Sequence, residues 1–248
     1  MAIRDDVSEQ EWQTRVDLAA CYRLVDHYGM SDLVGTHISA RVPGEESAFL
    51  INPYGWYFDE ITASSLVKVD LDGRILSEVE SPINPAGFVI HSAVLGARPD
   101  VACVLHTHTR AGMAVSAMEC GLLSITQHSM KFHNRLSYHE YEGVATNLDE
   151  RERLVRDLGD NHAMILRNHG LLTAGRSVSE AFFLMFRLEK CCQAQVDAMA
   201  GGTKLHMISP EVSESTSRMM EDRGTRTSDL AWPGQIRRLD KLDPSYKQ

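Results

Sequence analysis

Apolar residues recur every three or four positions in several stretches of the chain, which is the spacing of one face of an α-helix. The first such stretch, Ser8–Tyr28, opens with Ser8 and Glu11 at capping-box spacing and ends before Gly29. The same spacing predicts further helices over Phe88–Ala97, Arg110–Glu119, Asp149–Gly159 and Ser177–Ala200.

Shorter apolar runs between the predicted helices indicate strands. Two pairs of runs are typical of hairpins: LVGTHISARV with SAFLINPYGWYF around Pro43-Gly44, and Ser65–Val69 with RILSE around Asp72-Gly73. Further strands are predicted in VACVLHTH, Leu122–Gln127, Arg135–Glu142 and Ala163–Leu166. Strand clusters that alternate with helices favour an α/β fold whose helices cover both faces of one sheet.

The C-terminal segment lacks this patterning. From Gly201 onward the chain is polar and poorly patterned up to Trp232, which predicts partly irregular helix and no separate domain. We therefore expect residues 1–202 to form a single domain. Residues 203–248 are expected to form an extension that packs on this domain or on a neighbouring subunit.

Composition narrows the possible partners and the location. The chain has 248 residues and a formal net charge of −9, which argues against nucleic acid as a partner. No run approaches the roughly 18 apolar residues of a membrane-spanning helix, and MAIRDDVSEQEW is too acidic and polar for a signal peptide. The 5 cysteines lack zinc-ribbon spacing, so we expect reduced thiols in a cytoplasmic protein.

Candidate chemistry lies at the end of VACVLHTH. Side chains two positions apart on a strand point to the same face, so His106 and His108 are spaced to share a metal ion. His169, in the apolar run AMILRNHGLLTAG, is the natural third ligand. Three neutral nitrogens with an open fourth position are the ligand set of a catalytic zinc-type site rather than a closed structural one.

Five sequence blocks occur in a fixed order: GTHISAR, INPYG, NPAGFVIHSAVLGARPDV, VLHTHT and LRNHG. Together they resemble the class II aldolase/adducin family over roughly Ser8–Gly202. The resemblance implies a three-layer α/β/α domain with a mixed, mainly antiparallel central sheet, and a homotetramer with active sites between subunits. It also implies that His106, His108 and His169 hold one divalent metal ion per chain, zinc ahead of manganese, iron(II) or cobalt.

The departures from this family concern its catalytic glutamate and its phosphate site. In the sugar-phosphate aldolases of the family a glutamate that moves the proton on the donor carbon lies four residues before the position of His91, where this chain has Gly87. Their phosphate-binding positions correspond here to Thr36-His37, Tyr54-Gly55 and Pro85-Ala86. Proline has no N–H and alanine has no hydroxyl, so a phosphate would lose most of its donors. A tyrosine that helps protonate the leaving aldehyde aligns with Ser129.

The chemistry that remains favours a metal-dependent carbon–carbon lyase on a non-phosphorylated, oxygen-chelating substrate. A metal held by three histidines binds two neighbouring oxygens of a substrate and accepts electron density as the adjacent bond breaks. Decarboxylation is favoured over retro-aldol cleavage, because loss of carbon dioxide needs no glutamate to remove a proton from carbon. Tyr54 and His37 in place of phosphate-binding groups suit a hydroxy-aromatic or heteroaromatic carboxylate.

A proton must still reach the product after the carbon–carbon bond breaks. The candidate donors are His37, His91, His128 and Tyr141. Substrate contacts are expected from Thr36, Ser39, Tyr54, Gly55, Gly87 and Gln127. The other histidines of the central region have no evident partner and are expected at the surface: His133, His139 and His162.

Two other functions fit the same sequence. One is an aldolase on a small non-phosphorylated hydroxy-carbonyl compound, which keeps the metal and changes the bond that breaks. The other is a non-catalytic oligomerisation module like the head domain of adducins, which the NPAGFVIHSAVLGARPDV block also resembles. We expect an enzyme, because all three ligand histidines are present and no adducin-like basic tail follows. A scaffold need hold no stoichiometric metal.

Overall fold

One sheet organises the fold. The computed structural model describes residues 3–77, 81–144 and 148–248, apart from the side chains of residues 222–226. The strands are β1 (His37–Val42), β2 (Glu45–Ile51), β3 (Val67–Asp70), β4 (Cys103–Thr107), β5 (Ser137–His139), β6 (Ala163–Leu166) and β7 (Gly170–Gly175). They form a 7-stranded sheet in the order β3-β2-β1-β4-β7-β6-β5. β5 and β6 are parallel and the other neighbours are antiparallel, which confirms the mixed, mainly antiparallel sheet.

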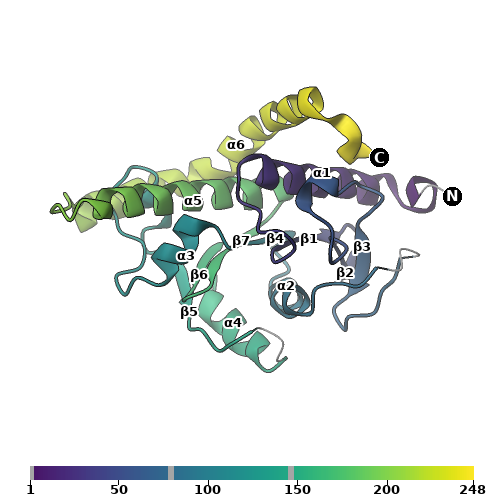
Figure 1. The fold of residues 1–248 in the computed structure, drawn as a ribbon, viewed down its shortest axis with the longest axis horizontal. Helices are drawn as coiled ribbons and strands as arrows, with labels where there is room; N and C mark the ends of the chain where they lie inside the picture. The colour runs from purple at the N-terminus through teal and green to yellow at the C-terminus, as the bar shows by residue number, and fades with distance from the viewer. Residues whose placement is uncertain (1–2, 78–80, 145–147) are drawn as a thin grey trace.

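Helices cover both faces of this sheet (Figure 1). They are α1 (Glu9–His27), α2 (Pro85–Ala97), α3 (Arg110–Ser116), α4 (Glu150–Leu158), α5 (Val178–Ala200) and α6 (Pro210–Leu242), with short 3-10 helices at η1 (Ile3–Asp6), η2 (Phe58–Glu60), η3 (Ser129–Phe132) and η4 (Pro244–Lys247). Alternate residues of β4 enter different cores: Leu105 packs in the core under α1 and α5, and Val104 packs in the core with α2 and α4. The predicted three-layer α/β/α architecture is therefore confirmed.

Side-chain caps determine where the helices begin. Ser8 accepts a hydrogen bond from the backbone N–H of Glu11, as the capping-box spacing predicts. α2 begins three residues before the predicted Phe88, because Pro85 occupies its first turn and Asn84 caps it. The Asn84 side-chain oxygen accepts the N–H groups of Ala86 and Gly87.

The C-terminal segment is more regular than the sequence predicts: residues 202–209 are irregular, but a helix extends from Pro210 onward. α6 is one long helix that contains Pro233, and it packs along α5 and α1 (Figure 1). Among the side chains that the structure describes between Pro210 and Leu230, the buried ones are serines rather than apolar residues, namely Ser213, Ser217 and Ser228. Hydrophobic periodicity cannot reveal such a face. α6 and η4 contact α1 of the same chain, while the boundary at residue 202 and packing on a neighbouring subunit stay predictions.

Two predicted strand features are also corrected. Leu122–Gln127 is a loop, because side chains rather than a neighbouring strand bind its N–H groups: Tyr138 binds that of Leu122, and Gln195 binds that of Leu123. The second hairpin is reduced to β3 and a single antiparallel bridge between Val69 and Ile75.

Among the described residues, no helix has both the length and the apolar character needed to cross a bilayer.

Candidate metal centre

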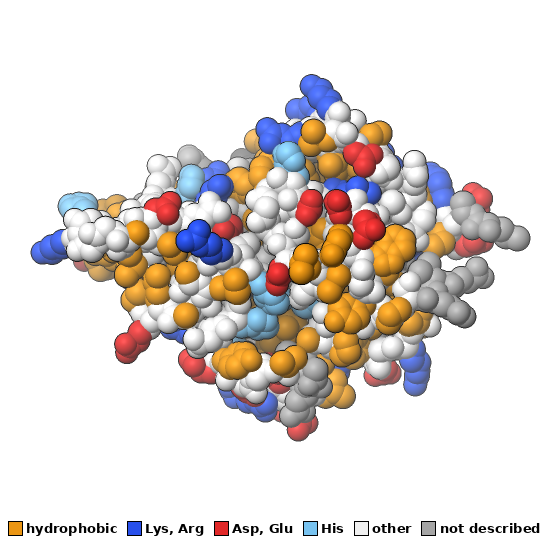
Figure 2. All heavy atoms as spheres, in the orientation of Figure 1, with side chains coloured by type: hydrophobic (Ala, Val, Ile, Leu, Met, Phe, Trp, Pro, Cys, Tyr) orange, Lys and Arg blue, Asp and Glu red, His pale blue; other side chains and the backbone are white. Residues whose placement is uncertain are grey.

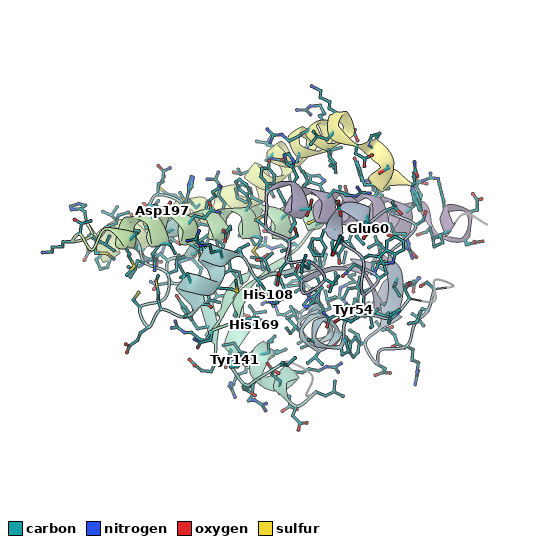
Figure 3. The ribbon with its side chains drawn as sticks, in the orientation of Figure 1. Tyr54, Glu60, His108, Tyr141, His169 and Asp197 are labelled. Carbon is teal, nitrogen blue, oxygen red and sulfur yellow. The ribbon has the colours of Figure 1, made fainter. Side chains whose placement is uncertain are left out.

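Three histidines from the middle of the sheet meet at one place, and Figure 3 labels two of them, His108 and His169. His106 is buried on β4, where it pairs with His37 on β1 and with Leu172 on β7. His108 follows directly after the strand, and His169 lies in the tight turn between β6 and β7. Figure 2 shows histidine atoms near the middle of this face, with hydrophobic side chains around them.

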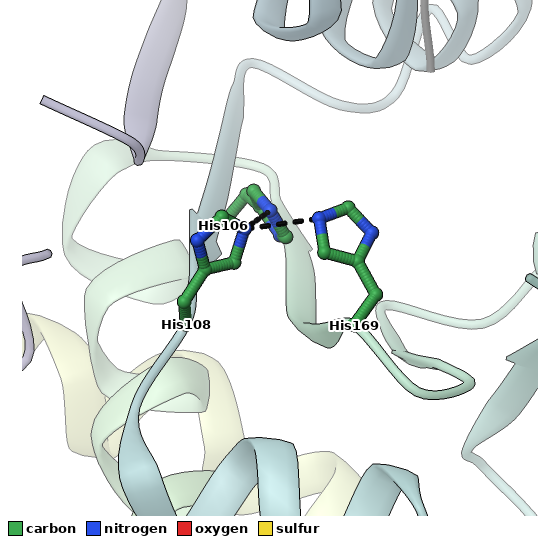
Figure 4. Close-up of side chains that lie close together, drawn as sticks. All are labelled: His106, His108 and His169. Carbon is green, nitrogen blue, oxygen red and sulfur yellow. Dashed lines mark hydrogen bonds between the residues drawn. The ribbon is translucent and has the colours of Figure 1, made fainter. Parts of the chain in front are cut away.

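The Nε2 atoms of these histidines converge (Figure 4). His108 Nε2 lies 2.8 Å from His106 Nε2 and 2.9 Å from His169 Nε2, and the ligand atoms all lie within 4.8 Å of one another. In a tetrahedral zinc site with bonds of about 2.0–2.1 Å, neighbouring nitrogens are roughly 3.3 Å apart. Small side-chain shifts would bring the three rings to that spacing.

Two of the three rings form hydrogen bonds through the nitrogen that points away from the triad. These bonds show why the three histidines suit a cation. His106 Nδ1 is 2.9 Å from the carbonyl oxygen of Leu171, and His108 Nδ1 is 3.0 Å from Asp32 Oδ2. A carbonyl or carboxylate oxygen only accepts, so each Nδ1 carries the proton and each Nε2 presents a bare lone pair. Two facing lone pairs repel unless a cation lies between them, so this donor set fits a divalent metal.

Burial keeps two of these rings neutral. It lowers the pKa of His106 well below its usual value, and the neighbouring rings of His169, His37 and His108 lower it further. Burial also lowers the pKa of His169 to about 4, with smaller contributions from His108 and His139. Neutral imidazole is the form that binds a metal ion, so His106 and His169 are in that form at neutral pH without having to lose a proton.

A second group of buried polar side chains lies beside the triad. His37 Nδ1 is 2.8 Å from His91 Nε2, and His91 Nδ1 is hydrogen-bonded to the hydroxyl of Ser39. The His37 ring lies 5.0 Å from the His106 ring, measured between centroids. A Cβ atom on Gly87 would be 2.6 Å from His37 Cδ2, so the His37 ring fills the space beside this glycine.

We expect this buried group to make the metal-free protein sensitive to acid. Burial lowers the pKa of His91 to about 3, whereas an unfolded chain would have a value near 6.5. Above pH 6.5 the His91 ring is neutral in both the folded and the unfolded state. Below pH 6.5 the unfolded chain takes up a proton on this ring that the folded chain excludes, so the free energy of unfolding decreases as the pH is lowered. The contribution of His91 is a loss of about 2 kcal/mol between pH 7 and pH 5.

Urea unfolding of the metal-free protein at pH 7 and pH 5 measures this effect. The variant His91→Gln should show a pH dependence that is smaller by about 2 kcal/mol. Equal pH dependence in the two proteins would contradict the assignment.

The remaining candidate residues lie at different distances from the triad. Tyr141 is exposed, lies 6.5 Å from His169 between ring centroids, and lines a small cleft with it (Figure 3). Thr36 is buried, and its hydroxyl has no hydrogen-bond partner in the described part of the chain. Tyr54 is exposed in the turn after β2, where Gly55 has a φ of 99° that glycine adopts without strain. Their roles toward a substrate stay predictions.

Gln127 and His128 are not brought to the triad within this chain. They line a separate cavity of about 190 Å³ beside α5 and α6, together with Phe183 and Arg187. The His128 ring accepts a hydrogen bond from Arg187. Any role of these residues at a metal centre would require the site of another subunit, and this also stays a prediction.

Sequence reasoning missed two acidic partners of histidines. His139 is buried rather than at the surface, and Asp157 Oδ2 on α4 lies 2.7 Å from its Nδ1 there. His133 and His162 are half-buried, which also corrects the prediction that they are exposed. Asp32, the partner of His108, precedes the first family block, and the only local signal for it is its place in a turn that ends at Gly35.

The chain matches known proteins in both sequence and fold. The family model of the class II aldolase and adducin N-terminal domain matches residues 16–196. The chain belongs to the class II aldolase/adducin family. In this family, the crystal structure of an aldolase II superfamily protein from Pseudomonas syringae has a TM-score of 0.96 and 49% identity, and covers 100% of both chains.

Relatives in the class II aldolase/adducin family carry names from both of its branches. An L-fuculose 1-phosphate aldolase from Glaciozyma antarctica PI12 has a TM-score of 0.84 and 27% identity, covering 97% of this chain and 93% of that chain. Alpha-adducin of Rattus norvegicus is 43% identical over 210 residues, which cover 82% of this chain and 28% of that protein. Because the relatives include both an aldolase and an adducin, similarity alone does not assign the function of this chain.

Proposed function

We propose that this chain is a divalent-metal-dependent carbon–carbon lyase on a non-phosphorylated substrate that chelates the metal through neighbouring oxygens. Decarboxylation of a hydroxy-aromatic or heteroaromatic carboxylate is favoured over retro-aldol cleavage. The observation that carries the proposal is the convergence of the His106, His108 and His169 Nε2 atoms. The Nδ1 atoms of His106 and His108 donate hydrogen bonds to oxygen acceptors, which fixes the orientation of both rings. Zinc is the expected ion, and manganese, iron(II) and cobalt are alternatives.

The start of α2 supports a substrate without phosphate. A helix N-terminus binds a phosphate through free N–H groups of its first turn. Here Pro85 has no N–H, and Asn84 accepts those of Ala86 and Gly87 with its side chain and that of Phe88 with its backbone oxygen. The helix start therefore has no N–H left for a phosphate.

The surroundings of Gly87 support decarboxylation. A general base that removes a proton from carbon would need a side chain at this position, and the His37 ring fills that space instead. Loss of carbon dioxide breaks a carbon–carbon bond and leaves the electron pair on the substrate, so only a proton has to be supplied. The metal ion, when bound, stabilises the negative charge that develops on the substrate.

The chain's own residues then orient the substrate and supply this proton. His37 is the proton donor that lies next to His106, and its Nε2 is left for the substrate because His91 engages its Nδ1. Burial lowers the pKa of His37 well below its usual value, so the neutral ring passes on a proton that comes from water rather than one that it holds in advance. His91 and Ser39 are buried behind it, so they act by holding the His37 ring. Tyr141 lies at the opening of the cleft that His169 lines and contacts the substrate there. Homotetramer formation would bring Gln127 and His128 of a neighbouring subunit to the same site.

Metal content and carbon dioxide release test the proposal together. The chain purified without chelators is expected to hold about one divalent ion per chain by elemental analysis. It should release carbon dioxide from an ortho-hydroxybenzoic acid and should not cleave L-fuculose 1-phosphate. Phosphosugar cleavage without any decarboxylation would overturn the choice of substrate.

The same samples discriminate the two alternatives. An aldolase on a small hydroxy-carbonyl compound would hold the metal and release an aldehyde instead of carbon dioxide. An adducin-like oligomerisation module is favoured by the 43% identity to alpha-adducin, and would fold and assemble without stoichiometric metal.

A further inference from the structure

A carboxylate outside the histidine triad contacts one of its members. Asp32 lies in the loop between α1 and β1, and its Oδ2 is 3.0 Å from His108 Nδ1. This nitrogen is on the side of the ring opposite the one that faces His106 and His169. The contact therefore leaves Nε2 free for a metal ion.

The loop is shaped around this contact. The carbonyl oxygen of Asp32 accepts the N–H of Gly35 at 2.7 Å, which closes a tight turn. Within that turn Leu33 has a φ of 45°, a left-handed conformation that is unfavourable for leucine, and its side chain is 69% exposed. Packing of the leucine side chain does not account for this strain, so other contacts of the turn have to stabilise it.

Gly35 keeps space free on the other side of the contact. A Cβ atom there would be 3.1 Å from Asp32 Oδ2 and 3.6 Å from His108 Nδ1. Ser31 also ties the start of the loop to α1, because its hydroxyl donates to Asp26 at 2.7 Å. The turn, the glycine and this anchor together hold the Asp32 carboxylate against the histidine.

We propose that Asp32 is a positioning residue for the metal centre. Its carboxylate accepts the Nδ1–H of His108, which holds the ring in the tautomer whose Nε2 is the metal-binding nitrogen and makes that nitrogen a stronger donor. It also places a negative charge close to the site of the cation. The inference rests on the proposed function only in requiring that the triad binds a metal; it does not depend on which substrate reacts.

Metal affinity of Asp32 variants tests the inference without any substrate. Zinc is titrated into the metal-free full chain in competition with a chelator, for the wild type, Asp32→Asn and Asp32→Ala. Both variants are expected to bind zinc about 10–100 times more weakly, which is the usual effect of removing such a partner. Asp197→Asn is the matched control, because it removes the same charge from an exposed position on α5 away from the triad (Figure 3).

A second measurement separates positioning from loss of folding. Nitrogen-15 NMR of the metal-free chain should show His108 with its proton on Nδ1 in the wild type and a mixture of tautomers in Asp32→Ala, while circular dichroism is unchanged. Zinc affinity within twofold of the wild type in both Asp32 variants would overturn the inference and leave the proposed function standing. A wild type that binds no zinc would overturn both.

Discussion

Replacing His106 by alanine is expected to remove the stoichiometric metal and to lower turnover by at least about a thousandfold, which corresponds to about 4 kcal/mol of lost transition-state stabilisation. His106 is fully buried, and its Nε2 lies 2.8 Å from that of His108, which is also next to the His169 nitrogen. The two remaining ligands lie outside the strands: His108 is just beyond β4, and His169 is in the turn between β6 and β7. The variant therefore lacks the one metal ligand that is fixed inside the sheet.

Elemental analysis and turnover of the same purified samples measure this effect. His206→Ala is the control, because His206 is an exposed histidine of the segment between α5 and α6. The control should keep the metal and the activity of the wild type. Chelation of the wild type should reproduce the loss seen in His106→Ala, and adding the metal back should restore activity in the wild type only. Wild-type turnover by His106→Ala would exclude metal catalysis at this triad.

The parts of the fold that the sequence predicts depend on signals between close neighbours in the chain. Ser8 and Ser177 cap the helices that they were expected to open. His106 and His108 lie two residues apart on or beside one strand, so the alternation of a strand is enough to bring them together. His169 follows a second short apolar run and is predicted as the third ligand on that ground, and the family blocks imply the same residue.

Features that depend on partners far away in the sequence could not be predicted. His139 is buried beside Asp157 and Glu150 on α4, and neither acid is marked by spacing. The contact between Asp32 and His108 joins residues 76 positions apart. The buried serines of α6 carry no hydrophobic pattern, although the helix packs against η3, α5 and α1. Long-range packing decides each of these, and single-sequence patterns do not contain it.

The contact between Gly87 and His37 is another long-range contact that the sequence alone does not predict. The family resemblance identifies the position as lacking a glutamate, but it does not indicate that His37 fills the space. Only the structure brings β1 and the start of α2 together closely enough for the ring to lie against the glycine. This contact leads to a test of His37 that leaves every metal ligand unchanged.

Gly87→Ala is expected to lower turnover about a hundredfold while the metal is retained, because small displacements of catalytic groups have effects of this size. The added Cβ would be 2.6 Å from His37 Cδ2 and 2.8 Å from its Cγ, and the ring cannot swing away freely because it is buried and bonded to His91. Overpacking of this kind should also lower the free energy of unfolding by about 1–3 kcal/mol.

Gly96→Ala on the same helix separates the clash from the chemical change itself. A Cβ at Gly96 would meet Leu71 at 3.7 Å, an ordinary contact, so this variant should keep full activity and gain up to about 1 kcal/mol from helix propensity. Turnover, metal content and urea unfolding of the two variants are compared with the wild type. The metal ligands are the same in all three proteins, and the three nearest atoms to the added Cβ belong to His37, so we expect a loss of turnover confined to Gly87→Ala to act through that ring. Equal turnover in Gly87→Ala and the wild type would remove His37 from the reaction and leave Tyr141 as the nearer candidate for the proton donor.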